Sequence, residues 1–296
     1  MRAASPVLAF VVLLTVWELA ARLFNIPVYI LPAPSIIFHE FMSFGFNFVG
    51  HAGATLKTIL LGFLVSVLIA IPFGAVIASW RPFSDAVFPL IVFAHAIPVI
   101  ALAPIIVLSL GPGMAARVVV VVLISFFPIL VSTVTGLRAT PTEMLELAKV
   151  AGSSRLQSLL TVELPGAVPY IFNGLRIGIS TAVIGGVVGE FVSSDNGLGY
   201  LVVHSTTNFD VPRAMASVAI LALMSVILYQ SVEWTEASVP LVDKWRALIC
   251  NEKCGAHRVC PYRTRRFVQS AIASITQAAD LRALLIHVPD SIACAP

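Results

Sequence analysis

Two ionisable side chains in strongly apolar stretches of this 296-residue chain are its clearest candidates for chemistry. Glu190 follows the run Ile177–Gly189, and His95 lies in a long stretch without formal charge. A carboxylate or an imidazole in an apolar environment is costly unless it binds or relays something polar, so such groups are often functional. A kink is expected at Pro98 and a close helix approach at Gly186. These four residues are the candidate lining of a solute path.

Both ionisable residues also have an interpretation without function. Glu190 could lie at a membrane interface, where ionisation is cheap, and His95 could be a hydrogen-bonded histidine of the protein interior. The six histidines are too scattered for a hydrolytic site, and no Gly-x4-Gly-Lys-Ser/Thr motif is present to hold ATP phosphates. The segment Cys250–Cys260 contains metal-ligand residue types without the paired spacing of a zinc site. We therefore expect no catalytic residue and no bound metal.

The elements that must position these residues are membrane-spanning helices. Hydrophobic residues make up 58% of the chain and charged residues 11%, whereas soluble domains are about a quarter charged. This composition excludes a disordered chain, a nucleic-acid-binding protein and an ordinary cytosolic enzyme. A helix needs about 20 apolar residues to cross the hydrocarbon core, so we expect an all-α, polytopic membrane protein. The apolar runs predict six spans, at about residues 4–22, 58–80, 87–110 (kinked), 117–137, 175–193 and 214–233.

Basic residues predict the orientation of these spans. The connection from Arg138 to Arg176 also contains Lys149 and Arg155, which makes it the most basic loop of the apolar body. Because Lys and Arg favour cytoplasmic loops, this connection is expected in the cytoplasm, and six spans then place both termini there. The run that follows Arg2 could instead be a signal peptide, but Trp17 and Glu18 interrupt its end, where a cleavage site of small residues belongs.

Within this connection the sequence predicts two short helices. The pattern Thr140–Glu143 is that of a capping box, with threonine at the N-cap and proline at the first helical position. This helix is expected to end at Gly152, because glycine readily adopts the positive φ of a C′ residue. A second helix is expected to begin at Ser153 or Ser154 and to end at Pro165.

One face of the first helix is apolar, since Met144, Leu147, Ala148 and Ala151 follow helical spacing. Two interpretations of this face are open. It could pack against the cytoplasmic ends of the protein's own spans, or it could dock a soluble partner.

The same connection resembles the EAA loop of ABC-importer permeases. In that family, Glu-Ala-Ala is followed by three residues, Gly, nine residues and Ile-x-Leu-Pro. Here Glu146–Ala148, Gly152 and Val162–Pro165 have this spacing, with Leu147 in place of the first Ala and Val162 in place of Ile. The segments that resemble the nitrate/sulfonate/taurine group of these permeases are Leu31–Ser35, Ile97–Pro98, Ala101–Pro104, Gly111, Gly174–Arg176, Glu190 and Gly197–Leu201.

This resemblance implies a type I ABC-importer permease, which is a membrane-spanning subunit and not itself an enzyme. In the family the loop is a coupling helix that contacts a cytoplasmic ATP-binding subunit. Carried over, Glu146, Ala148 and Gly152 form the docking turn, while Leu164 and Pro165 end the second helix at the membrane. The bulk of Leu147 is a departure from the family pattern.

The resemblance also implies the rest of the assembly. Its partners are the ATP-binding subunit, an extracytoplasmic solute-binding protein, a second copy of the permease and membrane lipids, but no nucleic acid. The chain needs no cofactor of its own, because the partner subunit binds ATP. It is expected in the bacterial cytoplasmic (inner) membrane, importing a small solute such as nitrate, a sulfonate or taurine. The alternative, a secondary transporter driven by an ion gradient, predicts mid-span charge pairs and inverted repeats, and neither is evident.

The charge distribution divides the chain into two regions. The permease domain is expected to cover residues 1–245, with the coupling loop at 138–173. Residues 246–296 form a basic tail with 7 Lys/Arg, 3 Asp/Glu and all four cysteines. We expect the tail to be a cytoplasmic extension that can be deleted without loss of transport.

Overall fold

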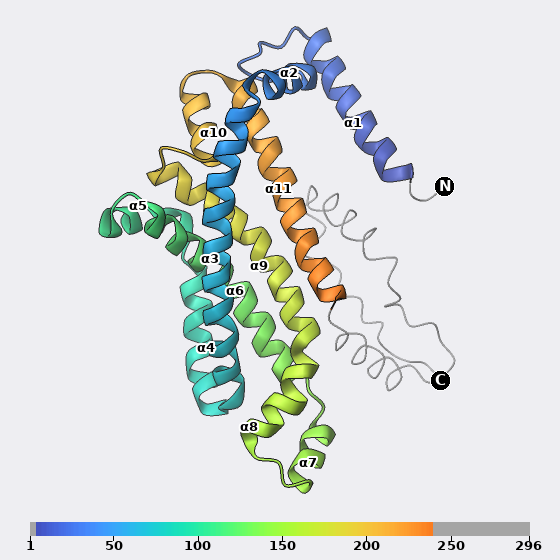
Figure 1. The fold of residues 1–296 in the computed structure, drawn as a ribbon, viewed down its shortest axis with the longest axis vertical. Coiled ribbons are helices and arrows are strands. Elements are labelled where there is room, and N and C mark those ends of the chain that lie inside the picture. Colours follow the sequence, from blue (N-terminus) through green and yellow to red (C-terminus); the bar gives the residue numbers. More distant parts are fainter. Residues whose placement is uncertain (1–3, 239–296) are drawn as a thin grey trace. The chain divides into compact units, whose positions relative to one another are not determined.

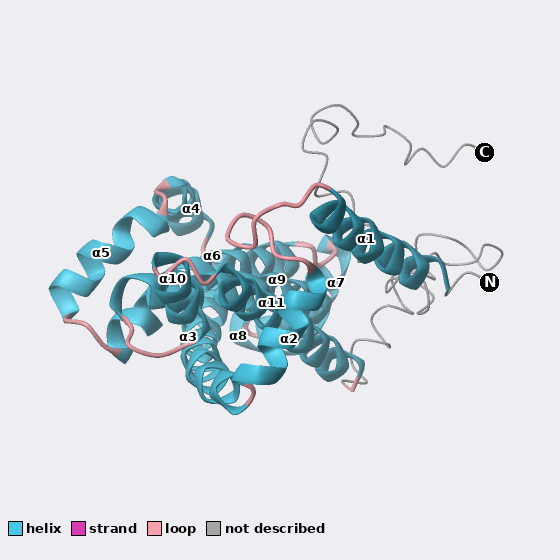
Figure 2. Ribbon diagram, turned by 90° about the horizontal axis from the view of Figure 1, so that it is seen from above, coloured by secondary structure: helices cyan, strands magenta, loops and turns pink. Residues whose placement is uncertain are grey.

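The computed structural model describes residues 4–238, so the predicted tail lies outside the described residues. The described part consists of helices joined by loops and contains no strand (Figure 2), which confirms the predicted all-α fold. The chain divides within its first helix: residues 4–14 belong to one compact unit and residues 15–238 to another. The packing described below is that of the second unit.

The helices appear along the chain in the following order (Figure 1): α1 (Ala4–Leu23), α2 (Pro34–Phe44), α3 (Phe46–Ser79), α4 (Arg81–Ala96), α5 (Val99–Leu110), α6 (Met114–Arg138), α7 (Thr142–Val150), α8 (Arg155–Ser158), the π-helical turn η1 (Leu159–Glu163), α9 (Leu164–Ser193), α10 (Leu198–Thr207) and α11 (Val211–Ala237). Four stretches are long and apolar enough to cross a membrane: α3, α6, the stretch Arg155–Ser193 and most of α11. The described part of the chain is therefore that of a polytopic membrane protein.

The predicted third span, 87–110, is two helices and not one kinked helix. The chain leaves α4 after Ala96 and enters α5 at Val99, with Pro98 in an extended conformation (φ −67°, ψ 103°). Proline has no backbone N–H and disfavours helical φ/ψ in the residue before it. The break at Ile97–Pro98 follows from these two effects.

Two other helices are longer than their predicted spans. α3 begins at Phe46, about three turns before residue 58, and α9 begins at Leu164, well before residue 175. The predicted spans began near Lys57 and Arg176 because these charges bound the apolar runs that located them. In the structure both lie inside helices, Lys57 exposed and Arg176 in an ion pair.

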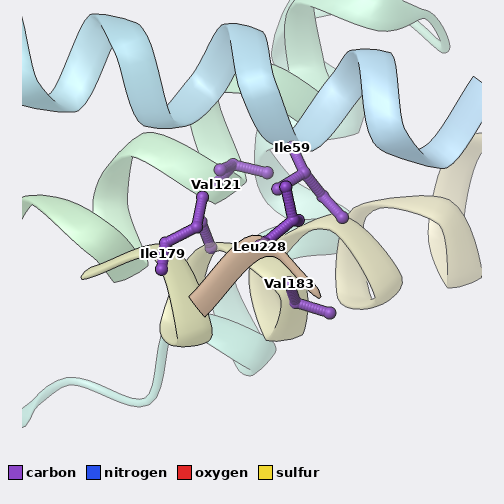
Figure 3. Close-up of a cluster of buried hydrophobic side chains, with 6 residues drawn as sticks. Ile59, Val121, Ile179, Val183 and Leu228 are labelled. Carbon is purple, nitrogen blue, oxygen red and sulfur yellow. The ribbon is translucent and has the colours of Figure 1, made fainter. Parts of the chain in front are cut away.

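The core lies where α3, α6, α9 and α11 meet. Ile59, Val121, Ile179 and Leu228, one from each of these helices, pack together (Figure 3). A Cβ atom on Gly185 of α9 would lie 2.8 Å from the Val121 Cα atom, so the two backbones touch at this point. Lipid tails give helices no hydrophobic reason to associate, and such close contacts supply the packing instead.

Arg176 of α9 forms an ion pair with Glu236, in the last turn of α11. The two side chains are 14% and 5% exposed, so water screens the pair little. The carboxylate of Glu236 lies at the negative end of the helix dipole, where an acidic residue is unfavourable without a nearby cation. The arginine thus offsets this effect and joins α9 to α11.

Replacing Arg176 with leucine is expected to lower the free energy of unfolding by about 3 kcal/mol, because it removes the cation that faces a buried carboxylate. SDS-induced unfolding of the purified protein would measure this. The exposed pair Arg22–Glu18, with the arginine 69% exposed, is the matched control. Arg22→Leu should change the stability by less than about 1 kcal/mol. Equal effects of the two substitutions would contradict the structural role of the buried pair.

Candidate functional site

The helix α7 begins one residue later than the capping box predicted. It starts at Thr142, and the N-cap residue is Pro141 (φ −57°, ψ 138°), which makes no side-chain capping bond. Because Pro141 is the N-cap residue, Thr140 lies one position before it. The Thr140 hydroxyl is therefore not the capping group that the sequence predicted. The capping box predicted at Thr140–Glu143 is therefore wrong.

The end of α7 is as predicted. Gly152 has φ +78°, its N–H donates to the Lys149 carbonyl (3.0 Å), and the Ser153 N–H donates to the Ala148 carbonyl (3.0 Å). These two bonds form a Schellman motif, which requires the left-handed residue at this position. The turn between α7 and α8 is thus a defined structure.

A capping box is present at the next helix. The Ser154 hydroxyl accepts from the Gln157 N–H (3.3 Å), and the Gln157 side-chain oxygen accepts from the Ser154 N–H (2.8 Å). Of the two predicted starts, Ser154 is the N-cap of α8. We call residues 142–158, which form α7, the Gly152 turn and α8, the hairpin.

Apart from the half-buried Leu145 and Ala148, the apolar side chains of the hairpin are exposed. Leu147 is 70% exposed, Val150 86% and Leu156 65%, and α7 has no buried residue. Glu146 and Gly152 are exposed as well, and a Cβ at Gly152 would meet no atom within 4 Å. Of the two open interpretations, packing against the protein's own spans does not fit a face this exposed.

Leu164 and Pro165 do not end the second helix, contrary to prediction. α8 continues through η1 into α9, and the Leu164 N–H bonds to the Leu159 carbonyl, five residues back. Pro165 lies in the first turn of α9, where its missing N–H and its ring are tolerated next to a π-helical turn. The hairpin is consequently continuous with the 30-residue helix α9.

Glu190, near the other end of α9, is buried inside the protein at 1% exposure. Its Oε2 atom accepts hydrogen bonds from the Thr55 hydroxyl of α3 (3.0 Å) and from the Gly199 N–H of α10 (2.8 Å). A Cβ at Gly197 would lie 2.4 Å from the same carboxylate, so the loop before α10 needs glycine there. Glu190 therefore holds the first turn of α10 against α3 and α9.

Sequence reasoning missed the partners of Glu190. The Leu198 N–H donates to the Thr55 hydroxyl (2.8 Å), and the Gly197 N–H donates to His51 Nδ1 (3.0 Å). Thr55 and His51 belong to α3, more than 130 residues before Glu190 in the chain. The one available signal was the pair of glycines around Leu198, which leaves room for a carboxylate.

The other three candidates for a solute path lie in different settings. A Cβ at Gly186 would be 2.8 Å from Ile59 Cγ1, so Gly186 is a packing contact between α9 and α3. His95 is exposed and stacks on the Phe127 ring of α6, with ring centroids 3.8 Å apart. Pro98 is exposed at the α4–α5 break. Gly186 and Glu190 thus lie one turn apart in packed interior, whereas His95 and Pro98 lie on an open surface. Within residues 4–238, no group of three His, Cys, Asp or Glu residues could hold a metal ion.

Comparison with known proteins connects this arrangement to a family. Residues 66–238 match the family model of the "binding-protein-dependent transport system inner membrane component". A probable ABC transporter permease protein of Haemophilus influenzae is 40% identical over 79% of this chain and 95% of its own length. The riboflavin transport system permease protein RibX of Chloroflexus aurantiacus is 38% identical over 73% of this chain and 82% of its own. Among solved structures, an inward-facing MetNI methionine ABC transporter has a similar fold, with a TM-score of 0.57 and 20% identity over 62% of this chain and 92% of the matched chain.

Proposed function

Because the chain belongs to the family of inner membrane components of binding-protein-dependent transport systems, we propose that its hairpin is the surface on which the ATP-binding subunit acts. The protein is the permease subunit of an ABC importer and a multi-pass membrane protein, and it works with an ATP-binding subunit and a solute-binding protein.

One observation carries the proposal: an exposed apolar hairpin continues directly into a membrane-spanning helix. Leu147 and Val150 offer a partner apolar surface that no described part of this chain covers. The Gly152 turn and the Ser154 capping box hold that surface in one shape. α9 is about 45 Å long at 1.5 Å per residue, so movement of the hairpin is passed on across the membrane. In this proposal Glu146, Ala148 and Gly152 form the docking turn.

The solute path is proposed to lie between two copies of the permease. A histidine at membrane depth must face protein or water, and His95 is exposed in a single chain. A second copy over the surface that carries His95 and Pro98 would give it such a neighbour. The remaining apolar surface would contact lipid. Gly186 and Glu190, which lie in packed interior, would support this path and not line it.

The remaining parts of the proposal concern orientation and cargo. The hairpin and both termini would be cytoplasmic, and the chain would have no catalytic activity and no cofactor of its own, with ATP bound by the partner. Residues 1–245 would suffice for transport. A relative is named for riboflavin, and the motifs resemble those of the nitrate/sulfonate/taurine group, so the solute would be a small molecule within this range.

The test is co-purification with the ATP-binding subunit. Leu147→Asp should reduce co-purification and coupled ATP hydrolysis at least about tenfold, since it places a carboxylate in an apolar contact. Thr142→Asp is the matched control, because it adds the same charge in the first turn of α7, where the helix dipole favours it. A wild-type chain that binds no ATP-binding subunit would refute the proposal. Uptake that needs no such subunit and stops on addition of a protonophore would favour a secondary transporter.

A further inference from the structure

The end of α9 and α10 lie at the opposite end of the long helices from the hairpin (Figure 1). A hollow lies between them. Its volume is about 450 Å³, within the range of ligand-binding sites. Tyr200, His204, Thr207 and Asn208 line it along one face of α10, and Ser194 lines it from the α9 side. None of the residues that line it is a lysine or an arginine. Besides these five polar side chains, the lining contains the carboxylate of Glu190 and the apolar side chains of Phe191, Val192 and Val203.

The start of α10, which forms one wall of the hollow, is held by hydrogen bonds to α3 and α9. Its first backbone N–H groups, at Gly197, Leu198 and Gly199, donate to three buried or half-buried side chains of α3 and α9. Leu198 and Leu201 are buried in a cluster with Phe48. A surface that keeps its shape before a partner arrives loses little entropy on binding.

Directly after Asn208, which lines the hollow, Phe209 occupies a position that favours glycine. Its φ is +57°, its N–H bonds to the Thr206 carbonyl (3.1 Å), and the Asp210 N–H bonds to the Ser205 carbonyl (2.8 Å). This is the same Schellman motif that ends α7, where Gly152 has the left-handed conformation. A bulky residue is strained there. Nevertheless Phe209 is 78% exposed, so its ring gains little from burial in this chain.

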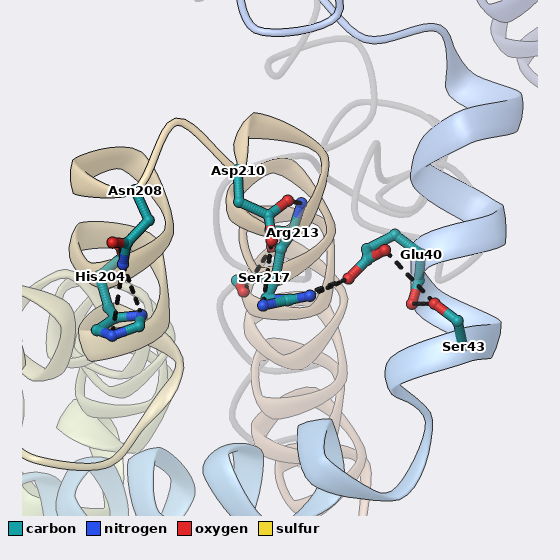
Figure 4. A network of polar contacts seen from close by, with 7 residues as sticks. All are labelled: Glu40, Ser43, His204, Asn208, Asp210, Arg213 and Ser217. Carbon is teal, nitrogen blue, oxygen red and sulfur yellow. Dashed lines mark hydrogen bonds and ion pairs between the residues drawn. The ribbon is translucent and has the colours of Figure 1, made fainter.

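Both neighbours of Phe209 are held in place (Figure 4). The Asn208 side chain donates to the His204 carbonyl (2.7 Å). Asp210 pairs with Arg213 (3.1 Å), which also pairs with Glu40 of α2 (2.8 Å). Phe209, whose backbone is strained, thus lies on a turn that these contacts hold in place. Strain that the surrounding structure maintains at an exposed site indicates function.

We infer that the hollow and the ring of Phe209 form the surface on which the solute-binding protein docks. This inference rests on the proposed function, because the hairpin must be cytoplasmic for this end to face the other side of the membrane. The hollow would receive a short uncharged polar segment of the partner, and Phe209 would contact an apolar residue beside it. Anionic lipid headgroups fit less well, since they favour clusters of Lys and Arg.

The first experiment is site-specific photo-crosslinking in whole cells with the full chain. A photoreactive residue at position 209 is expected to yield an adduct that mass spectrometry identifies as a solute-binding protein. The same residue at position 147, in the hairpin, should capture the ATP-binding subunit. An adduct at 147 but none with a solute-binding protein at 209 overturns this inference and leaves the proposed function standing. An adduct with phospholipid alone at 209 also overturns it, whereas failure at 147 counts against the proposed function.

The second experiment titrates the captured solute-binding protein against the purified complex of permease and ATP-binding subunit. Phe209→Gly should relieve the strained turn, leaving the unfolding temperature unchanged or raised, yet weaken binding at least about tenfold. Thr207→Trp, which fills the hollow, should weaken it similarly. Thr206→Ala is the control, because that hydroxyl bonds only backbone carbonyls of its own helix in the structure. Basal ATP hydrolysis should be equal in all variants. Wild-type affinity in Phe209→Gly and Thr207→Trp overturns the inference.

Discussion

Replacing Glu190 with alanine is expected to lower the free energy of unfolding of the permease by about 2–5 kcal/mol. The substitution leaves the buried Gly199 N–H without an acceptor, at about 1–3 kcal/mol, and it leaves the Thr55 hydroxyl with only the His51 carbonyl (3.2 Å) to donate to. It also empties the space that Gly197 and Gly199 leave for the carboxylate. SDS-induced unfolding of the purified protein would measure the loss.

Two further variants separate the hydrogen bonds from the change in volume. Glu190→Gln keeps one carbonyl oxygen in place and should lose only about 1–2 kcal/mol. Thr55→Val combined with Glu190→Ala should destabilise by less than the sum of the two single changes, because the two residues share a bond. A Glu190→Ala variant as stable as the wild type but unable to take up solute would contradict the structural role and favour a place in the solute path.

Substituting arginine for Gly152 is expected to abolish coupling while the spans remain folded. The left-handed conformation costs about 1–2 kcal/mol for a residue with a side chain, and the arginine would project from the turn that the ATP-binding subunit is proposed to approach. Nothing in the described structure lies within 4 Å of a Cβ at this position. In the proposed complex the side chain would therefore clash with the partner and not with the permease. Co-purification and ATP hydrolysis should fall at least about tenfold.

The controls for Gly152→Arg test backbone strain and added bulk separately. Gly152→Asn should retain most of the coupling, because asparagine tolerates the left-handed conformation and is smaller. Gly50→Arg adds the same side chain at an exposed glycine near the start of α3, where a Cβ also meets no atom within 4 Å. It should leave binding of the ATP-binding subunit unchanged. Full coupling in Gly152→Arg would show that the turn does not contact the partner.

The amino-acid sequence was sufficient where the cause is local or compositional. Apolar, weakly charged runs of this length lie in a membrane as helices, because a helix satisfies its own backbone hydrogen bonds. This determined the fold class. The positive φ of Gly152 and the helix start at Ser154 follow from short-range backbone chemistry: the first was predicted, and Ser154 was one of the two predicted starts. The spacing from Glu146 to Pro165 was enough to identify the family. Local rules failed at Thr140, because the chain placed its extended residue one position later, at Pro141.

Only the tertiary structure determined what the interior charges and glycines do. Glu190 is matched by a hydroxyl and by N–H groups that come from α3 and α10, and no local rule pairs residues 135 positions apart. A predicted span began beside Arg176 because its charge bounds an apolar run, whereas the partner that lets it lie inside a helix, Glu236, is 60 residues away. The sequence predicted that a helix ends at Leu164 and Pro165, yet α8 continues into α9 through a π-helical turn. In each case the free energy comes from contacts between distant segments, and those contacts exist only once the helices have packed.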